Sequence, residues 1–177
     1  MIHSLAIIAL LAAPAATPAP KCVTKRQIAD AAMVFTPFIV QAITEKCRAH
    51  VPAGSFLATK GTAFHARLTA ESAGREASAG QVLLTVMGGD VPPVKDTESL
   101  VKFMGSMVSG MAVSELPVEN CTEISGLMEA LSPLPAENIG MLAASAAALV
   151  ERNKGAAAGA DGKPPQGLDK FVLCKDG

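Results

Sequence analysis

The chain has 177 residues, a formal net charge of −1 and an apolar content of 50%. It contains no Trp or Tyr and only six Phe, so it offers few aromatic surfaces on which bases could stack. Neither half of the chain is basic enough to indicate binding to phosphates. We therefore expect no binding to nucleic acid.

Residues 2–13 form an apolar run, and small residues follow it, including Ala13-Pro14-Ala15. The run is too short to be a permanent membrane span but has the length of a cleaved secretory signal. The start of this segment has no Lys or Arg, only the α-amino group and His3, so a buried N-terminal helix is the alternative. Lys21 stands where a lipid-modified Cys22 would need a small residue, so lipidation is not expected. We interpret residues 1–20 as a signal peptide and expect a periplasmic or secreted product without a transmembrane segment.

The mature chain is long enough for one domain, which we place at residues 21–152. Thr24-Lys25-Arg26-Gln27 has the form of a capping box, and apolar residues then recur every three or four positions as far as Cys47. These features predict a helix from Thr24 to Arg48, kinked by Pro37. Val51-Pro52 ends it.

A second helix is expected from Ala53 to about Ala73, with Gly74 as its stop. The stretch 75–87 is interpreted as a further short helix; a strand through 82–86 is the alternative, but no second strand is present to pair with it. Residues 88–93, GGDVPP, are typical of a loop.

The segment 98–116 shows the clearest amphipathic pattern, and we expect the rest of the chain to pack around it. Its apolar arc is rich in methionine and contains Leu100, Val101, Met104, Met107, Val108, Met111 and Ala112. Asp96 or Thr97 can cap the helix, and Leu116-Pro117 ends it.

Two similar sequences, LPVEN at 116–120 and LPAEN at 134–138, each place a proline and a glutamate where a helix begins. The first helix should reach about Leu131 and the second about Arg152. The residues expected to face inward are Ile124, Leu127, Met128 and Leu131 in the first helix, and Ile139, Leu142, Ala146 and Leu149 in the second. The small, polar residues 153–168 predict a flexible linker, and residues 169–177 a tail tethered through Cys174.

The four cysteines, Cys22, Cys47, Cys121 and Cys174, all follow the signal. In an oxidising compartment an even set of this kind predicts two disulfides, for which three pairings exist. A continuous helix over 24–48 would hold Cys22 more than ~30 Å from Cys47, which excludes that bond. We favour Cys22–Cys174 with Cys47–Cys121, and the crossed pairing remains open. The predicted fold is all-α, a single-domain bundle of about five to six helices stapled by two disulfides.

Basic and acidic residues are concentrated in different halves of the mature chain. Residues 21–67 carry seven Lys or Arg against two acids, whereas residues 90–151 carry nine acids against two lysines. The two halves can therefore face one another, although exposed ion pairs contribute only ~0 to 1 kcal/mol each. Two separately solvated faces explain the pattern equally well.

Candidate chemistry is sparse. Cys47 and His50 have the C-x-x-H spacing of a zinc site, but an exported cysteine is more simply assigned to a disulfide. Met104, Met107 and Met111 place three thioethers on one helical face, and thioethers select Cu(I). Methionine is also a common core filler, which is the simpler explanation. No nucleophile elbow, zinc-protease, phosphate-loop or dinucleotide motif is present, and no cofactor is expected.

The order of these features resembles small, uncharacterised exported helical proteins of Gram-negative bacteria. The residues that carry the resemblance are the signal, KCVT at 21–24, EKCRAHVPAGSFLATKG at 45–61, LPVENC at 116–121, LSPLPAEN at 131–138 and FVLC at 171–174. No activity is implied by it. The leading interpretation is a non-enzymatic protein that binds or supports an envelope partner; a Cu(I) carrier and an unrecognised hydrolase are the alternatives.

Overall fold

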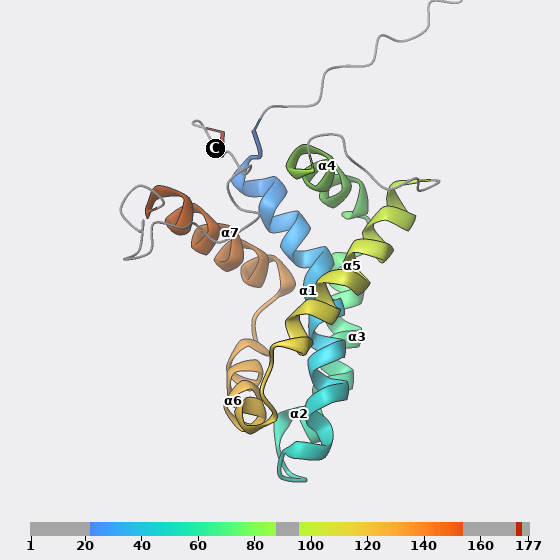
Figure 1. The fold of residues 1–177 in the computed structure, drawn as a ribbon, viewed down its shortest axis with the longest axis vertical. Helices are drawn as coiled ribbons and strands as arrows, with labels where there is room; N and C mark the ends of the chain where they lie inside the picture. Colours follow the sequence, from blue (N-terminus) through green and yellow to red (C-terminus); the bar gives the residue numbers. More distant parts are fainter. Residues whose placement is uncertain (1–21, 88–95, 154–172, 175–177) are drawn as a thin grey trace, which may run out of the picture.

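The computed structural model describes residues 22–87, 96–153 and 173–174 (Figure 1). The helices are α1 (Lys25–Cys47), α2 (Phe56–Thr59), α3 (Gly61–Ser72), α4 (Glu76–Val86), α5 (Thr97–Ser114), α6 (Cys121–Leu131) and α7 (Ala136–Asn153), with 3₁₀ turns at Arg48–His50 and Val118–Asn120. Within these ranges the only β pairing is an isolated bridge between Val23 and Leu173. The predicted all-α fold is confirmed.

Helix α1 is the centre of the bundle, with α3, α4, α5 and α7 packed around it (Figure 1). Nine of its residues are buried, against three in α5. Buried residues on α1 include the consecutive pairs Ile28-Ala29 and Met33-Val34, so more than one side of this helix is covered. The expectation that segment 98–116 would be the central helix is therefore wrong, because α5 is covered on one side only.

The start of α1 is the predicted capping box. The Gln27 amide donates to Thr24 Oγ1 at 3.2 Å, and the Thr24 amide donates to Gln27 Oε1 at 2.9 Å. The helix continues past Pro37, so Cys22 and Cys47 lie at opposite ends of it. The helix is therefore continuous between the two cysteines, which was the condition for excluding a Cys22–Cys47 bond.

Both disulfides follow the favoured pairing. Cys22 is bonded to Cys174 and Cys47 to Cys121, with Cα–Cα distances of 5.1 and 5.3 Å. Beside the first bond, the Cys174 amide donates to the Val23 carbonyl at 3.1 Å, and Val23 is buried. The predicted return of the C-terminal tail is thus confirmed at residues 173–174.

The segment predicted as one helix over 53–73 is two helices, α2 and α3. Lys60 separates them with φ −123° and ψ −11°. At the start of α3, a Cβ on Gly61 would lie 2.7 Å from Thr44 Cγ2, so the absence of a side chain lets α3 lie against α1. Gly74 has φ +81°, a backbone conformation suited to glycine, and it separates α3 from α4 as expected. Residues 76–86 are helical, as predicted, rather than a strand.

Helix α3 holds the connection between α6 and α7 through two side chains. Arg67 donates to the Ser132 carbonyl at 2.7 Å and to the Leu134 carbonyl at 3.1 Å. Glu71 pairs with Arg67 at 2.8 Å and accepts from the Ala136 amide at 2.6 Å, at the first turn of α7. That backbone bond, and then the Arg67 guanidinium, lowers the pKa of Glu71.

The basic and acidic halves do meet, at an ion pair of 2.9 Å between Arg26 and Glu137. Both side chains are more than half exposed, so the pair contributes at most about 1 kcal/mol. The expected signal at 1–20, the loop at 88–93 and the linker after Asn153 lie outside the described residues.

Candidate functional site

The methionine face of α5 is largely uncovered. Leu100, Val101 and Gly105 are buried, whereas Met107 and Met111 are 45% and 56% exposed. Met104 is half-buried. A Cβ on Gly105 would lie 2.8 Å from the Phe38 ring, so α5 contacts α1 through a glycine at this level. The expectation of a buried Met104, Met107 and Met111 face is therefore wrong for the last two residues.

Helix α6 is also covered on one side only. Its inner face consists of Cys121, Ser125 and Met128. The Ser125 hydroxyl accepts from the Leu57 amide at 3.2 Å, which joins α6 to α2. Leu127, expected to face inward, is 59% exposed.

Helix α7 shows the largest departure from the sequence prediction. Leu142 and Leu149, both expected to face inward, are 55% and 52% exposed, and Ala146 is exposed too. Between Ala136 and Val150 the buried residues are Ala136, Gly140, Ala144 and Ala148, which recur at every fourth position. A Cβ on Gly140 would lie 2.6 Å from the Ala29 carbonyl oxygen, so α7 approaches the backbone of α1 closely. Leu142 and Leu149 lie on the opposite side of the helix.

Charge accompanies the exposed apolar residues of α5 and α6. Four glutamates follow Met111 within eighteen residues, and none of them forms an ion pair with another described residue: Glu115, Glu119, Glu123 and Glu129. All four are exposed. We call these glutamates, together with the exposed apolar residues Phe103, Met107, Met111, Val118 and Leu127, the α5–α6 surface.

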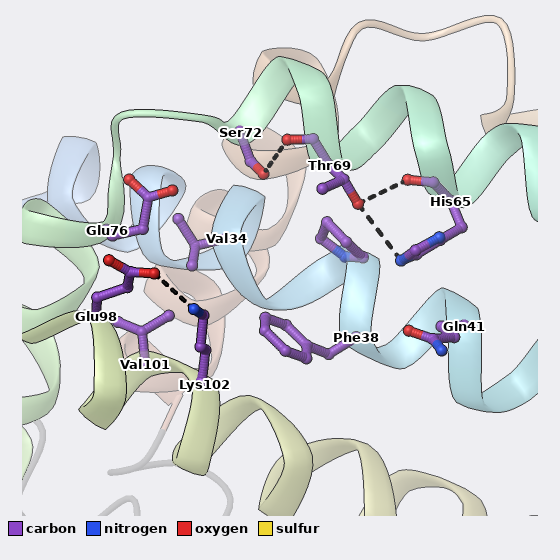
Figure 2. Close-up of a pocket in the computed structure, with 11 residues that line it drawn as sticks. Val34, Phe38, Gln41, His65, Thr69, Ser72, Glu76, Glu98, Val101 and Lys102 are labelled. Carbon is purple, nitrogen blue, oxygen red and sulfur yellow. Dashed lines mark hydrogen bonds and ion pairs between the residues drawn. The ribbon is translucent and has the colours of Figure 1, made fainter.

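A small cleft lies between α1, α3 and α5 (Figure 2). Its volume is about 250 Å³, and Val34, Pro37, Phe38 and Val101 supply its apolar lining. Lys102 is paired with Glu98 at 2.6 Å, and the hydrogen bond from this pair raises the pKa of Lys102. The cleft has room for a small ligand with an apolar body.

The cleft also contains a histidine beside a hydroxyl, the combination that a hydrolase would need. His65 Nε2 lies 3.4 Å from Thr69 Oγ1. The Thr69 hydroxyl donates to the His65 carbonyl at 3.0 Å, and no described carboxylate is hydrogen-bonded to His65. The pair therefore lacks the orienting group of a catalytic triad.

Metal-binding groups do not gather elsewhere in the described part of the chain. Within it, no cluster of three His, Cys, Asp or Glu side chains could hold an ion. Cys47, the first residue of the C-x-x-H sequence, is in a disulfide. Thioethers are the remaining soft donors, with Met107 and Met111 one turn apart on α5.

No protein-family model matches the chain, and no curated protein or solved structure is significantly similar to it. The fold and its surfaces therefore carry the functional argument.

The sequence predicts no membrane-length segment beyond residue 20, whereas Lys25–His50 is long and apolar enough to cross a bilayer by length and composition. It is the one such helix among the described residues. A core helix of a folded protein meets the same criterion, and α1 lies at the centre of the bundle.

Proposed function

We propose that this chain is a non-enzymatic exported protein that acts in the periplasm by binding an envelope partner through the α5–α6 surface. The observation that carries the proposal is the set of large apolar side chains left exposed beside four glutamates. Single exposed apolar residues are ordinary on a protein surface, but large apolar side chains exposed on successive turns of one helix, as Phe103, Met107 and Met111 are, are typical of an interaction site.

The spacing on α5 supports a contact surface of this kind. Phe103, Met107 and Met111 follow one another at four-residue intervals, so they lie on neighbouring turns of one helix. Their exposed fractions are 50%, 45% and 56%. Methionine has a flexible, polarisable side chain and adapts to irregular partner surfaces.

Charge defines the chemistry of the partner. The exposed glutamates would repel an acidic segment and attract a basic one, because complementary potentials steer association. We therefore expect the partner to present an amphipathic segment whose apolar face is flanked by Lys or Arg.

Export is supported by two separate features of the chain. The first is the apolar run and small residues of the first twenty positions. The second is the pair of disulfides, since such bonds persist in oxidising compartments and are rare in the cytosol. Both features, together with the resemblance to exported proteins of Gram-negative bacteria, support an envelope location.

A synthetic helical peptide of leucine and lysine tests the partner chemistry, with a leucine–glutamate peptide as its charge-reversed control. The lysine peptide should bind, and salt should weaken the binding. Leu127→Ser should reduce affinity through lost apolar contact, and Glu123→Gln through lost charge. Leu142→Ser removes an equally exposed leucine from α7 and should leave affinity unchanged. Equal binding of both peptides, or equal effects of Leu127→Ser and Leu142→Ser, would contradict the proposal.

Identification of the natural partner requires crosslinking in the native periplasm. A true partner should be lost with Leu127→Ser and retained with Leu142→Ser. It should also contain a basic amphipathic segment.

A Cu(I) carrier is the second candidate, favoured by the exposure of Met107 and Met111. Anaerobic Cu(I) loading tests it with the double variant Met107→Leu/Met111→Leu, which removes two thioethers but keeps apolar volume. Loss of bound copper with unchanged peptide affinity would support the carrier. A peptide-binding protein that takes up no copper would exclude it.

A further inference from the structure

The outer side of α7 carries an exposed apolar stripe with no charge. We define the stripe as Leu142, Ala146 and Leu149, at spacings of four and three. Met141 and Val150 flank it and are 39% and 47% exposed. No charged residue occurs between Asn138 and Val150, a length of about 18 Å along the helix.

A hollow of about 340 Å³ opens at one end of this stripe. Four of its lining residues are Asn138, Met141, Leu142 and Ser145, and Leu134 adds a wall from the preceding connection. The four helical residues stand at positions i, i+3, i+4 and i+7. That is the arrangement of the hole that receives a side-chain knob from a facing helix in a coiled coil.

We propose that a second copy of this chain covers the stripe, with the two α7 helices packed antiparallel about a twofold axis near Ser145 and Ala146. Such an axis places Leu149 of each copy opposite Leu142 of the other, over the hollow. The contact is isologous, since the same patch supplies both hole and knob. Ala146, at the crossing point, permits a close approach of the two helices.

The charge pattern favours a second copy over a membrane surface. Helices that lie on anionic membranes carry Lys or Arg on their polar face. Between Ala136 and Val150 the one charged residue of α7 is Glu137, which is paired with Arg26. A second α7 presents the same uncharged surface and needs no charge complement.

This proposal does not rest on the α5–α6 surface, and its test uses different residues. The mature, disulfide-bonded protein should be studied by sedimentation equilibrium with interference optics, since it lacks Trp and Tyr. The unmodified protein should be a dimer. Leu149→Glu and Leu142→Lys should each raise the dissociation constant by at least about tenfold, because each places a charge against an apolar surface. Ala143→Glu, at an exposed position outside the stripe, should leave it unchanged.

Mixing the two disruptive variants tests the antiparallel arrangement. Across the proposed axis the introduced lysine and glutamate face each other, while the second Leu142–Leu149 contact of the heterodimer is intact. The mixture should therefore dimerise with a lower dissociation constant than either variant alone. A parallel pairing would place like positions together and give no recovery.

Several results would overturn the proposal. One is a monomer at ~100 µM, where a dissociation constant below ~10 µM would give mostly dimer. Others are a dimer that Leu149→Glu leaves intact, a mixture that stays monomeric, or a monomer that binds phosphatidylethanolamine–phosphatidylglycerol vesicles through the stripe. Burial of Leu142 and Leu149 within a monomer would show that another part of the same chain covers them. Loss of peptide binding alone would leave the dimer standing.

Discussion

From residue 105 to residue 150 the inner and outer faces of the chain are built from different kinds of residue. The buried positions are Gly105, Cys121, Ser125, Met128, Ala136, Gly140, Ala144 and Ala148, of which Met128 alone is large. The outer positions include Met107, Met111, Leu127, Leu142 and Leu149. This half is therefore attached largely by close approach, a disulfide and hydrogen bonds from α3. Leu116, Ile124 and Ile139 are half-buried against the core, while the exposed large apolar side chains are left for other contacts.

The largest expected effect comes from removing the bond between α6 and α1. Cys47→Ser/Cys121→Ser should lower the free energy of unfolding by about 2 to 5 kcal/mol, because the bond constrains a long loop in the unfolded chain. Chemical denaturation followed by far-ultraviolet circular dichroism measures this. Leu127→Ser, on the outer face of the same helix, is the matched control and should change stability by less than about 0.5 kcal/mol. Similar losses of stability in the two variants would show that the inner and outer faces of α6 contribute equally to the fold.

A smaller effect is expected at the connection between α6 and α7. Arg67→Ala leaves the Ser132 and Leu134 carbonyls without their donor, and the loss should be about 1 to 2 kcal/mol because the side chain is already 35% exposed. Arg67→Lys keeps the charge but cannot reproduce the forked contact, so it should recover only part of the loss. Full recovery of stability by Arg67→Lys, in thermal or chemical denaturation, would show that the positive charge at position 67 is sufficient for this contact.

Acid should weaken the same connection through Glu71. The Ala136 amide and Arg67 lower the pKa of Glu71 below its ordinary value of 4.5, so protons bind preferentially to the unfolded chain. The stabilisation is complete above pH 4.5 and is lost as pH falls through the lower folded-state pKa. Unfolding of the wild type and Glu71→Gln should therefore differ less at pH 3 than at pH 7. Parallel stability profiles for the two proteins would contradict this assignment.

Much of the fold could be predicted because its signals are local. The capping box at Thr24, the proline starts and Gly74 each act within a few residues of themselves. The continuity of α1 excluded a Cys22–Cys47 bond, but it left two disulfide pairings open, and the structure has the favoured one.

The central helix and the exposed faces could not be predicted in the same way. Apolar periodicity finds the side of a helix that avoids water, but it does not show whether another element covers that side. In α7 the leucines formed the stronger apolar pattern, yet the close contact with Ala29 and Met33 needed glycine and alanine. The repetition of small residues from Ala136 to Ala148 was the readable signal, and its spacing of four is that of a tight helix contact.

The most direct test of the account compares Gly140→Ala with Leu142→Ala at protein concentrations low enough to keep the chain monomeric. Gly140→Ala should lower the free energy of unfolding by about 1 to 3 kcal/mol, since its Cβ would meet the backbone of α1. Leu142→Ala should change it by less than about 0.5 kcal/mol. Gly126→Ala, where nothing lies within 4 Å of the new Cβ, controls for helix propensity and should stabilise by about 0.5 to 1 kcal/mol. A large loss for Leu142→Ala with none for Gly140→Ala would mean that the leucine face of α7, and not its small-residue face, packs against α1.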